Sequence, residues 1–331
     1  STLMATLEAV EATLRQGQAP RRTVLLAFGH DEELGGRQGA AAIAALLAQR
    51  GVKAQFSLDE GAFVLERFFP GVERPVAQIG LAEKGYLSLA LEANAPGGHS
   101  SVPPPETAIG RIGRAVARIE ANPLPPQLDG PGPQGLKALA PALPWPMRVA
   151  LANDKLLGPV LVRALAARPA TNAMMRTTAV PTMIQGGVKD NVLPSTASAV
   201  VNFRLAPGDT IAGVYAHVRG AIDDPAVRVS QYGASAAEAT EIASLETAGG
   251  RALAEVIGRR VPGAIVIPGL VVGGTDTRHY GRVSNAPYRF TPLRLTPADV
   301  ARFHGVDERI SLANYAEMIA FQIDLIATAT R

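Results

Sequence analysis

The chain of 331 residues is long enough for two domains of about 150 residues each and for a substantial buried core. Hydrophobic residues make up 47% and charged residues 18%, and no apolar run approaches the length of a membrane span, so the composition predicts a globular protein that does not cross a membrane. The net charge of +3 is scattered and only 5% of residues are aromatic, which argues against nucleic-acid binding, and the lack of cysteine excludes thiolate ligands and disulfides.

The first 82 residues alternate predicted helices with predicted strands. Helices are expected at 2–16 and 39–50, and strands at 23–28 and 54–58. The run at 24–28 is apolar throughout, which is typical of a strand buried on both faces of a parallel sheet. This alternation with short connections predicts a layer of βαβ units.

From residue 83 the pattern becomes that of an inserted α+β module, which we expect to end at residue 236. The segment 86–93 alternates as a half-exposed strand does, and the prolines at 103–105 cannot continue a strand ladder. The stretch 122–146 is rich in proline and glycine and is interpreted as an irregular, anchored excursion. Further helices are expected at 107–121, 156–167 and 211–222, and strands at 177–184, 197–205 and 227–232.

After residue 236 the first pattern returns. Helices are expected at 245–256 and 312–327, a buried strand at 264–267 and a glycine turn at 271–276. The predicted fold class is therefore α/β. Residues 1–82 and 237–331 are expected to form a domain with a mostly parallel sheet between helices, interrupted by the inserted domain 83–236.

Three consecutive acids, Asp31, Glu32 and Glu33, follow the first predicted strand, at the sheet edge where open α/β sheets bind ligands. The second predicted strand ends similarly, at Asp59 and Glu60 beside a glycine. Adjacent carboxylates repel one another unless a cation, a proton or solvent relieves the charge. The pattern favours a divalent cation, and the alternative for the triplet alone is a solvated acidic loop.

Histidine is the only nitrogen ligand that suits such a cation here, and the chain has five. His217 falls in the middle of a predicted helix and is interpreted as a surface or satisfied side chain. His99 follows two glycines and precedes two serines, and His304 lies in a loop before the last helix.

Seven short motifs follow one another in an order that carries a family resemblance. They are DEELGG at 31–36, LDEG at 58–61, GGHSS at 97–101, GGVKDNVLP at 186–194, VNFRLAPGD at 201–209, GGTDTRHY at 273–280 and FHG at 303–305. With them the chain resembles metallopeptidase family 20, the dinuclear zinc amidohydrolases, and within it the carboxypeptidase S and N-acyl-amino-acid hydrolase subgroup. The resemblance implies a zinc-peptidase-like catalytic domain with an inserted lid and dimerisation domain.

The resemblance also implies a role for each motif. Glu32 would be the general base, Glu33 and His304 would bind one metal ion, and Asp59 would bind a second. His99 would reach the oxyanion in the active site of a second copy across a homodimer interface. The implied substrate-binding residues are Asn191, Arg204, Gly273 and Gly274.

General chemistry agrees with these roles. Two divalent metal ions, here expected to be zinc, can activate a shared water and polarise a carbonyl, so the protein needs only a base that moves one proton. An arginine grips a carboxylate with two hydrogen bonds, which suits Arg204 to a substrate with a free carboxylate. The alternative for Arg204 is a solvent-facing residue of an alternating strand.

The expected activity is hydrolysis of the amide bond next to a free carboxylate, in peptides or in N-acyl amino acids. In the family, two further metal ligands precede the helix with which this chain begins. We therefore expect an upstream segment in the native protein, and poor metal binding and no activity from this chain alone. The alternative function is a non-catalytic dimerisation or binding module that has lost the metal centre. Nucleotide binding is disfavoured, because the glycine turns lack the spacing of a phosphate loop. The compartment is not predicted.

Overall fold

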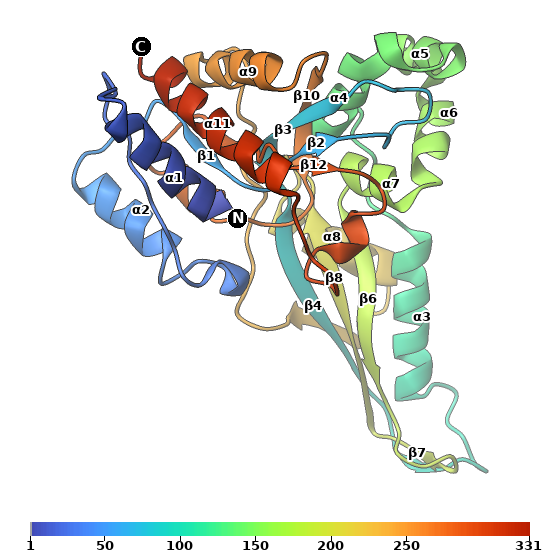
Figure 1. Ribbon diagram of the computed structural model, residues 1–331. Helices are drawn as coiled ribbons and strands as arrows, with labels where there is room; N and C mark the ends of the chain where they lie inside the picture. Colours follow the sequence, from blue (N-terminus) through green and yellow to red (C-terminus); the bar gives the residue numbers. More distant parts are fainter. Residues whose placement is uncertain (1) are drawn as a thin grey trace. The chain divides into compact units, whose positions relative to one another are not determined.

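The computed structural model describes residues 2–331 (Figure 1). Its contacts divide the chain into two compact units. Unit 1 comprises residues 2–83, 128–164 and 241–331, and unit 2 comprises residues 84–127 and 165–240. Both combine helices with strands, so the predicted α/β class is confirmed. Among residues 2–331, no helix is both long enough and apolar enough to cross a membrane.

A mixed six-stranded sheet forms the centre of unit 1. Its strands are β1 (Ser57–Asp59), β2 (Val64–Leu65), β3 (Val76–Glu83), β10 (Ile265–Val271), β11 (Pro287–Arg289) and β12 (Arg294–Leu295). The order is β1-β11-β3-β2-β12, and β10 also pairs with β3. The pairs β1–β11, β10–β3 and β12–β2 are parallel, whereas β11–β3 and β2–β3 are antiparallel. The sheet is thus less parallel than expected, because the connection 66–75 is too short for a parallel crossover, which needs a dozen residues or more.

Unit 1 also contains helices, some packed on its sheet and others packed on those helices. They are α1 (Thr2–Arg15), α2 (Ala40–Gln49), α4 (Pro131–Leu139), α5 (Trp145–Ala152), α9 (Ala248–Arg260), α10 (Thr277–Tyr280) and α11 (Leu312–Ala329), with short 3₁₀ turns η1 (Glu32–Leu34), η2 (Ala140–Ala142) and η3 (Val300–Arg302). Side chains alternate along β3, so Ile79 packs with Leu253 of α9 and Phe321 of α11, while Val76 packs with Leu139 of α4. In Figure 1, α1 (blue) lies beside α11 (red).

The stretch that follows the predicted helix 107–121 lies in a different unit from the one expected. Residues 128–164 belong to unit 1 rather than to the inserted domain 83–236. The physical reason is the contact of α4 with β10, in which Leu139 is fully buried with Ile267. Helix α6 (Asp154–Ala166) then leads the chain back to unit 2.

Unit 2 is an antiparallel sheet packed against two helices. Its strands are β4 (Gly85–Asn94), β6 (Thr178–Gln185), β8 (Thr196–Leu205) and β9 (Val227–Gln231), in the order β6-β8-β4-β9. Helices α3 (Ala108–Ala121) and α8 (Ile211–Ile222) share one apolar core with the sheet, and α7 (Pro169–Met175) precedes β6. A two-stranded ribbon, β5 (Gly98–His99) with β7 (Val192–Leu193), completes the unit. The predicted antiparallel character of this region is confirmed.

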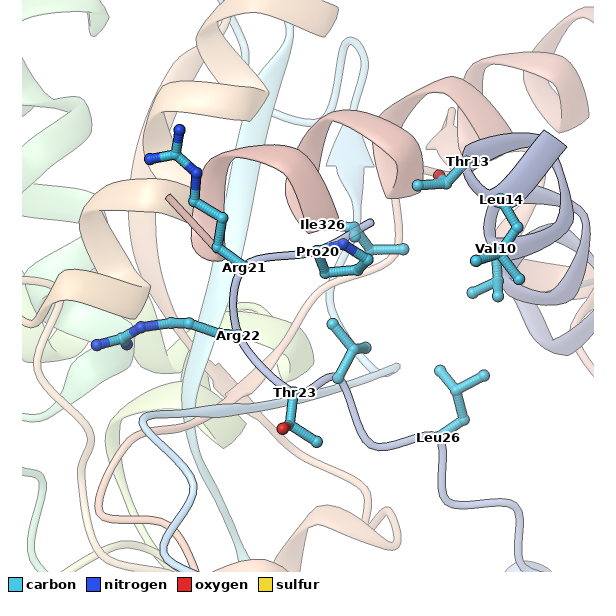
Figure 2. Close-up of a pocket in the computed structure, with 10 residues that line it drawn as sticks. Val10, Thr13, Leu14, Pro20, Arg21, Arg22, Thr23, Leu26 and Ile326 are labelled. Carbon is cyan, nitrogen blue, oxygen red and sulfur yellow. The ribbon is translucent and has the colours of Figure 1, made fainter. Parts of the chain in front are cut away.

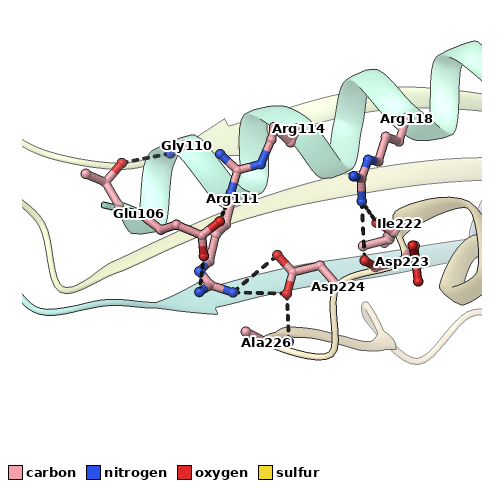
Figure 3. A network of polar contacts seen from close by, with 10 residues as sticks. Glu106, Gly110, Arg111, Arg114, Arg118, Ile222, Asp223, Asp224 and Ala226 are labelled. Atoms are coloured by element: carbon pink, nitrogen blue, oxygen red, sulfur yellow. Dashed lines mark hydrogen bonds and ion pairs between the residues drawn. The ribbon is translucent and has the colours of Figure 1, made fainter. Parts of the chain in front are cut away.

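Arginines of α3 fix that helix to the loop after α8. Figure 3 shows Arg111 between Glu106 and Asp224, and it lies 3.0 Å from the Asp224 carboxylate. Arg118 donates to the backbone oxygens of Ile222 and Asp223. These contacts hold α3 and the α8–β9 connection together at the rim of the apolar core.

The strand expected at 23–28 is wrong. Those residues belong to no strand, and Leu25 is 51% exposed. A run of apolar residues becomes a buried strand only beside a neighbour that completes its backbone hydrogen bonds, and no strand of residues 2–331 pairs with it. From this run, Thr23, Val24 and Leu26 instead line a pocket of about 400 Å³ with Val10 and Leu14 of α1 and Ile326 of α11 (Figure 2).

Candidate functional site

The acidic turn is built locally. Asp31 accepts hydrogen bonds from the backbone N–H groups of Gln38 and Gly39, both at 2.8 Å, which lowers the pKa of its carboxyl and folds the loop back onto the start of α2. Gly36 has a φ of +64°, and a Cβ there would collide with the Asp276 carboxylate. The turn therefore brings Glu32 and Glu33, in η1, to the edge of the sheet near the 273–280 loop.

Glu32 lies among other carboxylates. Burial, and after it the charges of Glu33, Glu60, Asp276 and Asp59, together raise the pKa of Glu32 to about 7. A pKa raised toward neutrality suits a group that must both accept and release a proton.

Glu33 and His304 lie close together in the fold, although they are 271 positions apart in the sequence. The distance from His304 Nε2 to Glu33 Oε1 is 3.8 Å, and both side chains are more than three-quarters exposed. His304 follows η3 and has a φ of +53°, so the loop turns sharply at this residue. The two proposed ligands of one metal ion thus lie together and open to solvent.

Asp59 ends β1, where both of its carboxylate oxygens accept hydrogen bonds. Oδ1 accepts from the Glu60 N–H at 2.8 Å, and Oδ2 accepts from the Thr277 hydroxyl at 2.9 Å. Asp276, next to Thr277, has its pKa raised by burial and then by the charge of Asp59. The ends of β1 and η1 and the loop after β10 therefore form one acidic cluster.

The donor chemistry of this cluster fits a divalent cation. It supplies carboxylate oxygens and an imidazole, which are the ligands zinc takes in the absence of cysteine. Burial and, after it, the charge of neighbouring carboxylates raise the pKa of Glu32 and of Asp276, and a cation would relieve that charge. Among residues 2–331, no three such side chains already converge on one point. The pair Glu33 and His304, and separately Asp59, are the residues that would hold metal.

Unit 2 brings two of the expected residues together. His99 pairs with Val192 across the ribbon, and the Ser100 N–H donates to the Asn191 carbonyl at 3.1 Å. The His99 ring is exposed, and its Nδ1 lies 2.8 Å from the Ser101 hydroxyl. The ribbon thus presents His99 with its Nε2 atom directed away from that contact.

Within unit 2, Arg204 lies away from His99 and Asn191. It lies eight residues along β8 from Thr196, which follows the ribbon, and a strand rises about 3.3 Å per residue. It is half-buried, with its guanidinium 4.8 Å from the centre of the Tyr86 ring. In unit 1, Gly273 and Gly274 are exposed in the loop after β10.

No role was predicted from the sequence for four residues near the cluster: Glu83, Thr277, Asp276 and Arg289. Glu83 and Arg289 are fully buried, and Arg289 Nε donates to Glu83 Oε1 at 2.8 Å. Asp276 and Thr277 belong to the GGTDTRHY motif, in which only the glycines had been assigned a role. A charged residue closing an apolar run, as Glu83 does, was the signal available for the buried pair.

Comparison with known proteins agrees with the family resemblance carried by the sequence motifs. The profile of peptidase family M20/M25/M40 matches residues 1–328. The chain is 39% identical over 331 residues to N-fatty-acyl-amino acid synthase/hydrolase PM20D1 of Mus musculus, covering 99% of this chain and 66% of that protein. It is 36% identical to the probable carboxypeptidase S-like 2 of Dictyostelium discoideum, covering 98% of this chain and 63% of that protein. The chain thus spans slightly less than two thirds of the length of these relatives.

Solved structures share the fold. The M20 family metallo-carboxypeptidase Sso-CP2 from Sulfolobus solfataricus gives a TM-score of 0.63 at 18% identity, covering 99% of this chain and 75% of that one. Human carnosine dipeptidase 1 gives 0.59 at 13% identity, covering 99% and 70%. These comparisons give no support to the expectation that this chain alone is inactive.

Proposed function

Because the chain belongs to peptidase family M20/M25/M40, we propose that it is a metal-dependent hydrolase of the amide bond next to a free carboxylate. The observation that carries the proposal is the acidic cluster, in which Glu33 comes within 3.8 Å of His304 while Glu32 has a pKa of about 7. Its substrates are N-acyl amino acids or small peptides, the two classes for which the relatives are named.

Each residue of the cluster has a proposed task. Glu33 and His304 hold one divalent cation and Asp59 holds a second, with zinc as the metal. When bound, such cations would lower the pKa of water and polarise the scissile carbonyl. Glu32, which is not a proposed ligand, accepts the proton of the attacking water and passes it to the leaving amine, and its pKa near neutrality suits both transfers.

The proposed substrate-binding residues are taken unit by unit. In unit 2, Arg204 would hold the free carboxylate and Asn191 the backbone of a substrate. In unit 1, Gly273 and Gly274 would leave room for a substrate beside the loop after β10. His99 acts on the oxyanion in a second copy of the chain, in a homodimer formed through unit 2. Its exposure on the ribbon supports this role.

The test compares hydrolysis of a panel of N-acyl amino acids and dipeptides by protein stripped with a chelator and by the same protein given zinc. We expect turnover of at least one substrate class only after zinc is restored, and the class that turns over separates an acylase from a peptidase. A rate that is unaffected by chelation would contradict the metal dependence. The lack of any hydrolysis by zinc-loaded protein would favour the non-catalytic binding module.

A further inference from the structure

A buried polar pair lies beneath Asp59 in the sheet of unit 1. Glu83 ends β3 and Arg289 ends β11, and both side chains have an exposed fraction of 0%. Arg289 stands directly opposite Asp59 in the β1–β11 register, and the charge of Asp59 acts on its guanidinium. The ends of three neighbouring strands are thus linked by charge.

Hydrogen bonds continue from this pair to Asp59. The Thr275 N–H donates to Glu83 Oε2 at 3.1 Å, and the Thr275 hydroxyl donates to Glu83 Oε1. The same hydroxyl oxygen accepts from the Thr277 N–H at 3.2 Å, and the Thr277 hydroxyl donates to Asp59 Oδ2 at 2.9 Å. Thr277 is 1% exposed, so water does not replace this last contact.

Stability alone is a weak explanation for such an arrangement. Well-packed apolar residues in place of a buried ion pair are often neutral or stabilising. What the arrangement supplies is the orientation of one carboxylate. With one donor on each oxygen, the plane of Asp59 is fixed, and each oxygen keeps lone pairs for a cation.

We propose that Thr277, held by Thr275 and the buried Glu83–Arg289 pair, is a positioning residue that orients Asp59 for metal binding. This inference rests on the proposed function, in which Asp59 is a metal ligand. Residues that orient a ligand without touching the metal commonly change its affinity 10- to 100-fold when replaced.

The experiment measures zinc affinity, by competition with a chromophoric chelator, for the wild-type protein and for Thr277→Val, Thr277→Ser and Thr291→Val. Valine keeps the shape of threonine and removes the hydroxyl, whereas serine keeps the hydroxyl. Thr291→Val is the matched control, because Thr291 is 3% exposed and its hydroxyl has no hydrogen-bond partner among residues 2–331. We expect about 10- to 100-fold weaker zinc binding by Thr277→Val, and affinities near wild type for the other two variants.

The outcomes separate this inference from the proposed function. Zinc binding by Thr277→Val at wild-type affinity would overturn the positioning role and leave the metal-dependent hydrolase standing. Equal weakening in Thr277→Val and Thr291→Val would overturn it too, since the effect would then come from packing. A wild-type protein that binds no zinc would overturn both proposals. If Thr277→Val does not fold, Thr277→Ala tests the same hydroxyl without added bulk, with the same expected loss.

Discussion

Replacing Arg289 by methionine should destabilise unit 1 strongly. The change removes the guanidinium whose Nε lies 2.8 Å from Glu83 Oε1, and leaves the Glu83 carboxylate at 0% exposure. Removing one partner of a buried ion pair costs about 3–5 kcal/mol. Glu83 keeps Arg278 at 3.2 Å and the two donors of Thr275, so we expect the lower end, about 3 kcal/mol.

The assay is urea unfolding followed by far-ultraviolet circular dichroism, as a double-mutant cycle with Glu83→Gln. A glutamine still accepts from Thr275 but carries no charge, so the double variant Glu83→Gln/Arg289→Met should be more stable than either single variant. In a thermal scan, the loss in Arg289→Met corresponds to a fall in Tm of about 6–12 °C. A loss below about 1 kcal/mol, or a double variant no more stable than the singles, would refute the reasoning.

Two further predictions concern unit 2. Burial lowers the pKa of Lys84 from 10.5 to about 8. Between these two pH values the unfolded chain therefore binds more protons than the folded chain. The free energy of unfolding should consequently rise with pH across this range, by up to about 3 kcal/mol. Chemical unfolding at pH 7 to 10.5 should show this rise in wild type and in the exposed control Lys189→Met but not in Lys84→Met, and parallel curves for all three would contradict it. Arg204→Lys should raise KM about tenfold with little change in kcat, because lysine lacks the two-pronged grip on a carboxylate. The control Arg228→Lys, 70% exposed, should leave KM unchanged, and an unchanged KM in Arg204→Lys would remove the carboxylate role.

Local patterns predicted much of unit 2. Helix α3 has apolar residues at helical spacing and begins after Thr107, whose hydroxyl accepts from the Gly110 N–H at 3.0 Å. Strand β4 alternates Leu87, Leu89 and Leu91 toward the core. Such elements carry their own periodicity, so the sequence alone predicts them.

Elements that depend on residues distant in the sequence were either not predicted or predicted wrongly. Strand β3, the central strand of unit 1, has glutamine at 78 and glycine at 80 within its apolar run, and no expected element covered it. The run at 24–28 has the composition of a strand but no partner among residues 2–331. Composition describes a single chain segment, whereas a strand forms only when a second segment pairs with it.

In the candidate site, too, some residues could be predicted from local motifs and others could not. The motifs Glu32, Glu33 and Asp59 were visible because consecutive acids near a glycine are conspicuous. The contact between Thr277 and Asp59 joins residues 218 positions apart, and the Glu83–Arg289 pair joins residues 206 apart. No local pattern encodes such pairings, so the groups that orient Asp59 emerge only from the fold.

The most direct test of the central claim is the turnover of zinc-loaded Glu32→Gln. Glutamine keeps the size of the side chain and removes the proton acceptor, and general base catalysis contributes about 10²- to 10⁴-fold to a rate. We predict a fall of that size in kcat at unchanged zinc content, with wild-type turnover in the exposed control Glu73→Gln. Turnover of Glu32→Gln within a factor of about three of wild type would contradict the assignment of the base, and with it the account of the acidic cluster as a hydrolytic site.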